Sequence, residues 1–293
     1  MINSVDTAIE LLIKYKETVL EGYVSEYLFE KQFLDSSNRE YAHGIWTAKW
    51  GGLHLFFIFK QELSDIDKKI LSNKLLNLLF SCWHVYEKDD KFYFSNENVT
   101  YDEKAFLNSV GNARVSRPVP IDKDGLTERK KTCIDFFKNN NLLFPIATER
   151  QFVNSFLEVH FYSVINIDYI ALNRDGELLL YEVKFKDENR EGYFGINAGQ
   201  KNLLGLLNVC GFRIVYAVLY KDRPHSTLNI FDYMNASDIT PKWYFANIDL
   251  NKYVKCQYVA NYTSLHGIWR QKVYYYDKNE ILDKGECHKL IIP

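Results

Sequence analysis

Apolar residues recur at helical spacing in the first part of the chain, which predicts helices over residues 4–34, 62–85 and around 101–110. Between the first two, the apolar runs IWTAKW and LHLFFIF are separated only by a Gly-Gly pair. This pattern predicts a β-hairpin over residues 44–60. The run KFYF predicts one more short strand. The N-terminal region therefore has the pattern of an α+β unit.

Residues 111–125 interrupt this pattern, because they contain Pro118, Pro120 and two glycines and show no apolar period. Such a composition is typical of a linker. We therefore predict two domains: an N-terminal α+β domain of residues 1–118, and a second domain of residues 119–293.

The second domain begins with a helical pattern from residue 126, followed by the strand-like runs FPIATERQFV, SVINIDYIAL and ELLLYEVKFK. The glycine-containing stretch EGYFGINAGQ predicts a flexible loop, and residues 198–210 predict a helix closed by Gly211. The run RIVYAVLY then predicts a buried strand. The order of helix, three strands, helix and strand predicts an α/β unit with a mixed sheet flanked by helices. Further strands are predicted near YVKCQYVA and QKVYYYD.

The composition is that of a globular protein, with 47% apolar and 25% charged residues among 293. No run of 18 apolar residues occurs, so we expect no transmembrane helix. The five cysteines contain no C-x-x-C pair, which favours reduced thiols and a cytoplasmic location over a disulfide framework. A net charge of −2 excludes a global cationic field but not a local basic surface. Residues 241–293 are the cationic part, with 8 basic and 5 acidic groups.

The most informative stretch is a predicted hairpin, in which the runs IDYIAL and LLLYEVKFK flank the turn NRDGE. If the loop comprises the five residues 173–177, Leu172 opposes Leu178 and Asp168 opposes Glu182. Lys184 then lies on the same face as Glu182, because side chains alternate along a strand. A four-residue loop would instead place Glu182 on the other face.

Directly opposed carboxylates repel each other, and charged groups in apolar strands are costly to desolvate. A divalent cation would offset both penalties, and Mg²⁺ is suited to one or two carboxylates with several waters. Lys184 could then orient or deprotonate a water, as phosphodiester hydrolysis requires. A solvent-facing hairpin edge with a salt bridge would place the same residues on one face. The pattern alone leaves both interpretations open.

Asp168, a hairpin, and then Glu182-Val183-Lys184 at the end of an apolar strand resemble the motif of the PD-(D/E)XK, or restriction-endonuclease-like, nuclease superfamily. The resemblance covers about residues 125–222 and includes the predicted element order. Asn166-Ile167 precede Asp168, where the family often has proline. The resemblance implies a restriction-endonuclease-like core within an α/β, overall α+β, fold.

The resemblance also implies roles for individual residues. Asp168 and Glu182 would bind Mg²⁺, for which Mn²⁺ would substitute, and Lys184 would act on the attacking water. Gln200 matches a Gln or Lys that many members place on the helix after the motif. For the Glu that members often place on the first core helix, Glu128 is the candidate and Glu149 its rival.

The function expected from this resemblance is a metal-dependent endonuclease acting on double-stranded DNA, in restriction, defence or recombination. Residues 1–118 would serve target recognition or assembly, and a homodimer would supply the two active sites that cutting both strands usually takes. Two alternatives stay open: an RNA-cleaving nuclease on the same fold, and a non-catalytic nucleic-acid-binding or scaffold protein.

Overall fold

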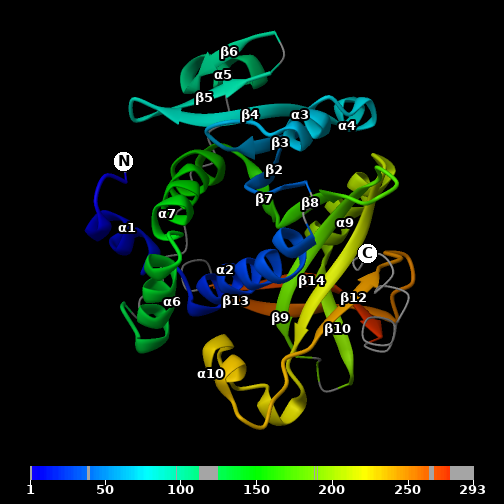
Figure 1. Ribbon diagram of the computed structural model, residues 1–293. Coiled ribbons are helices and arrows are strands. Elements are labelled where there is room, and N and C mark those ends of the chain that lie inside the picture. The colour runs from blue at the N-terminus through cyan, green and yellow to red at the C-terminus, as the bar shows by residue number, and fades with distance from the viewer. Residues whose placement is uncertain are drawn as a thin grey trace.

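The computed structural model describes residues 2–37, 40–96, 98–111, 125–187, 189, 191–263 and 267–277 (Figure 1). The helices are α1 (Val5–Leu12), α2 (Glu17–Phe29), α3 (Asp65–Leu71), α4 (Lys74–Leu79), α5 (Glu103–Val110), α6 (Glu128–Asn139), α7 (Leu143–Phe152), α8 (Glu158–His160), α9 (Ala198–Val209) and α10 (Ile230–Asn235). The strands are β1 (Tyr41–Ala42), β2 (Ile45–Trp50), β3 (Leu53–Phe59), β4 (Phe80–Lys88), β5 (Lys91–Ser95), β6 (Thr100–Asp102), β7 (Tyr162–Ile167), β8 (Tyr169–Leu172), β9 (Leu178–Lys186), β10 (Tyr193–Asn197), β11 (Phe212–Tyr220), β12 (Trp243–Asn247), β13 (Lys255–Thr263) and β14 (Gly267–Asp277).

These strands form three sheets, and the class is mixed α/β, or α+β overall, as the sequence predicts. The central sheet has the order β1-β8-β9-β11-β12, with β9 and β11 parallel and the other pairs antiparallel. A six-stranded sheet has the order β6-β5-β4-β3-β2-β7, and a three-stranded sheet has the order β10-β14-β13. None of the described helices is long and apolar enough to cross a membrane.

The central sheet is covered on both faces. Phe29 of α2 packs against the rings of Tyr169 and Tyr181, with centroids 5.7 and 5.1 Å apart. On the other face, three leucines of α9 pack against Ile170 and Leu180. Since Tyr169 and Ile170 are neighbours on one strand, their opposite directions follow from the period of two. Glu182 and Lys184 therefore point to the face that α9 covers.

Strands β7 and β8 are consecutive in sequence, with only Asp168 between them, yet they belong to different sheets. β7 pairs with β2 in the six-stranded sheet, whereas β8 pairs with β1 and β9 in the central sheet. The extended chain thus crosses from one sheet to the other at Asp168. This residue is held by the geometry of both sheets.

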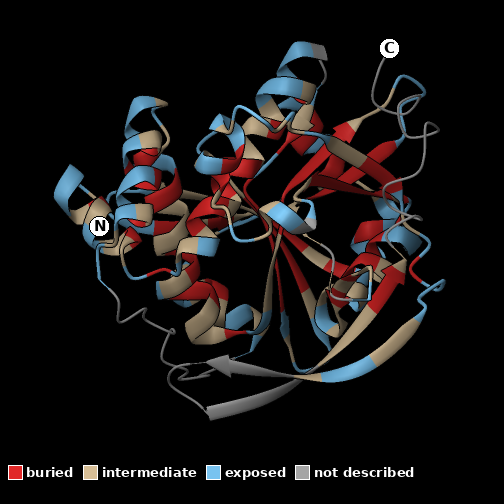
Figure 2. Cartoon of the chain, turned by 90° about the horizontal axis from the view of Figure 1, so that it is seen from below, coloured by how far each residue is buried: buried red, intermediate tan, exposed pale blue. Residues whose placement is uncertain are grey.

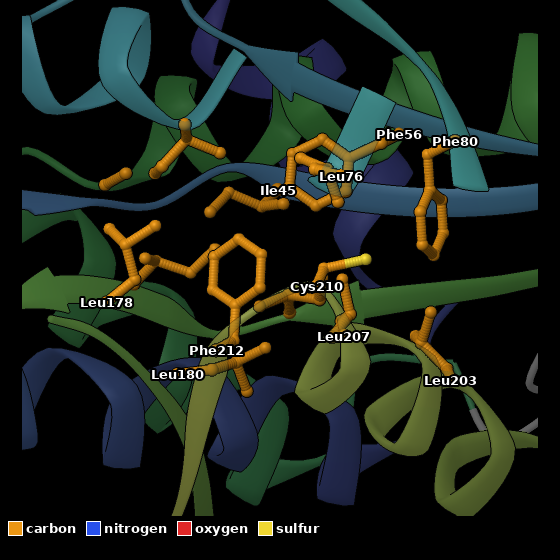
Figure 3. Packing of buried hydrophobic residues seen from close by; sticks show 14 of the residues in the cluster. Ile45, Phe56, Leu76, Phe80, Leu178, Leu180, Leu203, Leu207, Cys210 and Phe212 are labelled. Carbon is orange, nitrogen blue, oxygen red and sulfur yellow. The ribbon is translucent and has the colours of Figure 1, made fainter. Parts of the chain in front are cut away.

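The predicted boundary at residue 118 does not separate two cores. One hydrophobic cluster joins Ile45 and Phe56 from the six-stranded sheet to Leu180 and Phe212 of the central sheet and to Leu207 of α9 (Figure 3). A second cluster joins α1 and α2 to α6, α7 and α10. Figure 2 shows buried residues gathered in the middle of the molecule and exposed ones on the outer helices and loops. Most of the predicted linker, residues 112–124, lies outside the described residues.

Several elements match the sequence pattern, and three segments do not. Residues 80–85, predicted as the end of a helix, belong to the strand β4. The hairpin around the Gly-Gly pair is confirmed, with Trp50 opposite Leu53. The run FPIATERQFV, however, is the helix α7 and not a strand. Pro145 stands in the first turn, where backbone N–H groups have no partner within the helix, so the proline costs no hydrogen bond. The predicted loop EGYFGINAGQ contains the strand β10, which pairs with β14.

If the cores are shared, a cavity in the six-stranded sheet should loosen the central sheet too. Phe56 is fully buried, so Phe56→Ala should cost about 3–5 kcal/mol of unfolding free energy. Hydrogen exchange of the β9 amides should accelerate together with that of the β3 amides. Leu78→Ala is the control, because Leu78 is 77% exposed. Unchanged β9 protection beside weakened β3 would instead establish two independent domains.

Candidate active site at the crossing of two sheets

Asp168 lies at the crossing between β7 and β8 and is 5% exposed. Its Oδ2 accepts a hydrogen bond of 2.7 Å from the backbone N–H of Val183, and its Oδ1 accepts one of 3.1 Å from the Asn166 side-chain amide. A buried carboxylate with two such donors keeps one orientation. The bend in the chain therefore fixes the direction of Asp168.

The predicted register of the hairpin is confirmed. Leu172 pairs with Leu178 across a five-residue loop, and the ladder runs to Tyr169 opposite Tyr181. One step further, Asp168 meets the strand at Glu182 and Val183. Glu182 is 2% exposed and pairs with Tyr216 of β11 on its other side. Both carboxylates are thus buried at the same end of the hairpin.

Lys184 joins the two carboxylates. Its Nζ lies 3.5 Å from Asp168 Oδ2, makes a closer ion pair with Glu182 Oε1, and donates a 2.9 Å hydrogen bond to the carbonyl oxygen of Val183. Three oxygens therefore surround one ammonium group. The Lys184 side chain is 32% exposed, so this buried cluster is open to solvent at the lysine.

Gln200 completes the cluster from α9. Asn197 caps this helix by accepting a 2.8 Å hydrogen bond from the Gln200 backbone N–H. The cap directs the Gln200 side chain to the sheet, where its amide nitrogen donates to Glu182 Oε1. The structure thus brings together Asp168, Glu182, Lys184 and Gln200, four of the residues that the sequence predicts for the site.

The fifth predicted residue, Glu128, does not join them. It is the first residue of α6, and its side chain is 91% exposed beside Lys131, 4.0 Å away. Its rival Glu149 is half-buried and accepts a 2.7 Å hydrogen bond from the Trp46 indole. Burial raises the pKa of Glu149, and the charge of Asp168 raises it further. Of the two, only Glu149 is close enough to respond to the site.

An acidic residue that the sequence analysis missed lies closer. Glu26 of α2 lines the same cavity as Asp168, and burial followed by the Asp168 charge raises its pKa well above the usual value. The separation of 142 positions hides this pairing in the sequence. A signal does exist, because Glu26 is three residues from both Tyr23 and Phe29, which are buried, and so lies on their side of the helix.

Burial controls the charge state of the cluster. It raises the pKa of Glu182 to about 7, in the same direction as the Asp168 charge and against the pull of Lys184. Burial alone would lower the pKa of Lys184, but Asp168 and Glu182 together raise it above the ordinary value. One lysine thus stays charged between two carboxyl groups, of which Glu182 is half-protonated near neutral pH.

A cavity of about 440 Å³ opens beside the cluster, between α2 and the end of β9. Its lining includes Asp168 and Lys184, together with Glu26 of α2 and Arg150 of α7. A volume of this size admits a small ligand or one unit of a polymer. The cluster is therefore accessible to a substrate from the side of α2.

The donor set suits a hard cation. Within the described ranges, no group of three or more His, Cys, Asp and Glu side chains is placed to hold a metal ion. The oxygens of Asp168, Glu182 and Val183 nevertheless converge on one positive charge, that of Lys184. Mg²⁺ typically binds through one or two carboxylates and completes its shell with water. Asp168 and Glu182 fit that requirement.

Comparison of the chain with protein-family models, with curated proteins and with solved structures finds no match. The chemistry of the cluster is therefore argued from its own residues.

The raised pKa of Glu182 predicts a pH-dependent stability. Between the ordinary value of 4.5 and about 7, the folded state holds a proton that the unfolded state has lost. Stability should therefore fall as pH rises through this window, by on the order of 2–3 kcal/mol for this group. Glu182→Gln should remove that part of the pH dependence, measured by urea unfolding in EDTA.

The matched control is Glu128→Gln, since the carboxylate of Glu128 is exposed. Its stability should follow that of the parent chain at every pH. A difference between the parent and Glu182→Gln that stays constant from pH 4.5 to pH 8 would contradict the assignment of this titration to Glu182.

Proposed function

We propose that this protein is a Mg²⁺-dependent nuclease that hydrolyses phosphodiester bonds in DNA. The observation that carries the proposal is the buried cluster in which Asp168 and Glu182 share the ammonium of Lys184 beside an open cavity. Structural ion pairs rarely place two carboxylates of one hairpin face together in the protein interior, because their repulsion and desolvation oppose folding. Catalytic sites nevertheless contain such groups, because the reaction requires them.

In this proposal, Asp168 and Glu182 hold the metal ion, which would supply a polarised water and neutralise charge on the phosphate. The ammonium of Lys184 contacts both carboxylates, so it can hold the attacking water or stabilise the charge that develops on the phosphate oxygens. Gln200 donates to Glu182 and keeps that carboxylate in place. Glu26 faces the same cavity and is a further acidic group near the reacting atoms.

The order of the elements agrees in part with the core that a place in the PD-(D/E)XK superfamily implies. The hairpin β8–β9, the helix α9 and the parallel strand β11 follow in the expected order. The strand expected before the hairpin is not FPIATERQFV, which is helical. Instead β1, from residues 41–42, pairs with β8 at the sheet edge, and α2 precedes it in sequence. The first helix and strand of such a core would then come from the N-terminal region.

Metal binding should be measurable without any substrate. Mg²⁺ or Mn²⁺ should raise the melting temperature, because a cation relieves the repulsion between buried carboxylates and binds only the folded state. Asp168→Asn should reduce this effect strongly, whereas Glu128→Gln should retain it. The effect should be larger at pH 8 than at pH 6, because binding requires ionised Glu182. A melting temperature that ignores both metals at pH 8 would exclude the metal site.

Cleavage tests the activity itself. The parent chain should nick or linearise plasmid DNA with Mg²⁺ but not with EDTA. Lys184→Ala should lower the rate by about 10²-fold or more, while DNA affinity changes little, because affinity is spread over many phosphate contacts. Gln200→Ala should lower the cleavage rate less than Lys184→Ala does. Glu128→Gln should cut at the parental rate.

Parallel assays on single- and double-stranded RNA separate the RNA-cleaving alternative from the proposed one. If the parent binds DNA without cutting it and Lys184→Ala weakens that binding, the protein is a binding module. A Lys184→Ala protein that cuts as fast as the parent would overturn the nuclease assignment.

A further inference from the structure

The residues that line the cavity beside Asp168 include more cationic than acidic side chains. Four of its lining residues are cationic, namely Arg129, Arg150, Lys184 and Lys221, and three are acidic, namely Glu21, Glu26 and Asp168. Arg129 pairs with Glu21 at 2.6 Å, and Lys184 pairs with Asp168. Neither Arg150 nor Lys221 has an ion pair of this kind among the described residues, although Glu26 and Glu149 are near enough to Arg150 to raise its pKa.

Arg150 is presented to the cavity by a cage of aromatic rings. Its guanidinium carbon lies 5.0, 4.9 and 5.3 Å from the ring centroids of Tyr15, Tyr23 and Trp46. None of these rings lines the cavity, so they support the guanidinium from behind. Its Nε is buried and has no hydrogen-bond partner among the described residues. A guanidinium held between aromatic rings keeps one orientation, as the recognition of an oxyanion by its fork of donors requires.

Lys221 faces the same cavity from the end of β11. Its Nζ donates 2.8 and 3.2 Å hydrogen bonds to the carbonyl oxygens of Ser226 and Leu228 and lies 4.7 Å from the centroid of the Phe185 ring. These neighbours orient the ammonium but do not neutralise it. Burial lowers the pKa of Lys221, as expected for a cation that lacks a full counter-charge.

Glu26 is the third acidic residue of the lining, so four cationic residues face three acidic ones even when Glu26 is ionised. The hydroxyl groups of Thr18 and Thr227 also belong to the lining and add neutral donors. The lining thus combines cationic residues and threonines with the Asp168–Lys184 pair.

We propose that this cavity is a phosphate-binding subsite in which Arg150 and Lys221 hold one phosphate group of a nucleic-acid strand next to the bond that is cleaved. The inference rests on the proposed function for the identity of the strand, but the phosphate site itself can be tested without cleavage. The volume of about 440 Å³ fits one nucleotide unit and not a duplex segment. The subsite would therefore take a single strand or a strand end.

The test measures binding of thymidine 5′-monophosphate and of thymidine to the full chain in EDTA, by calorimetry. The monophosphate should bind and thymidine should bind much more weakly, since only the former carries the group that the two cations recognise. Lys221→Gln should weaken monophosphate binding about tenfold, the usual effect of losing one charge-assisted hydrogen bond. Lys138→Gln is the matched control, because Lys138 lies on α6 outside the cavity and pairs with Asp135.

Arg150→Lys keeps the charge but loses the planar fork of donors, so it should weaken monophosphate binding. The double variant Arg150→Lys/Lys221→Gln should weaken it further. If the packing of Arg150 makes that variant unstable, Lys221→Gln alone still decides the question. Thymidine 5′-methylphosphate, a diester, distinguishes the two sources of the group. Retained affinity assigns the subsite to an internal phosphate, and lost affinity assigns it to a terminal one.

Equal binding of thymidine and its monophosphate, or equal effects of Lys221→Gln and Lys138→Gln, would overturn the subsite. This outcome is distinguishable from failure of the nuclease proposal. A chain that cuts DNA without a Lys221-dependent phosphate site keeps the activity and loses the subsite. A chain that binds the monophosphate through Lys221 but never cuts keeps the subsite and loses the activity.

Discussion

The structure of the site depends on one lysine held between two buried carboxyl groups. At an effective dielectric constant of about 20, two unit charges about 5 Å apart repel each other by about 3 kcal/mol. Lys184 offsets much of this repulsion by contacting both Asp168 and Glu182. Burial nevertheless raises the pKa of Glu182 to about 7, and the charge of Asp168 acts in the same direction. Either a proton on Glu182 or a second cation would therefore stabilise the cluster further.

This cluster exists only because the chain bends at Asp168. The residue ends one strand of the six-stranded sheet and begins the next in the central sheet, so both sheets position its carboxylate. The six-stranded sheet is consequently part of the support of the site, although all its other strands come from the first 110 residues. A shared hydrophobic cluster fixes the two sheets relative to each other. Stability and site geometry are thus coupled across the predicted domain boundary.

The local part of this design could be read from the sequence. The Asp-Gly turn and the alternating apolar strands determine the hairpin register, and the register places Asp168, Glu182 and Lys184 on one face. Contacts between distant segments were harder to predict from the sequence. Glu26 reaches the site from α2, and β1 pairs with β8, through tertiary packing that no local period encodes.

The misplaced elements have physical causes of the same kind. FPIATERQFV is rich in strand-favouring residues, but its apolar side chains pack on α1 and α6 as a helix, so tertiary burial outweighs propensity. Glu128 has the residue type and approximate position expected of a site acid, but it is the first residue of α6 and its side chain faces solvent. Only the direction of a side chain decides between such candidates, and direction depends on packing.

The two sides of the site have opposite charge requirements, and this asymmetry explains the composition of the cavity. A phosphodiester that approaches Asp168 and Glu182 carries the same sign of charge as they do, so the carboxylates alone would repel it. A metal ion on the carboxylates would remove part of that repulsion.

An anion that approaches from the α2 side also requires positive charge along its path. Arg150, Lys184 and Lys221 are among the residues that line the cavity there. Glu182 and Gln200 do not line this cavity, and the hydrogen bond from the Gln200 amide keeps the Glu182 carboxylate in place. A hairpin selected only for stability would have no reason to combine two buried acids with a neighbouring cavity wall in which cations outnumber acids. A site that must bring an anion to a cation-binding pair of carboxylates requires both.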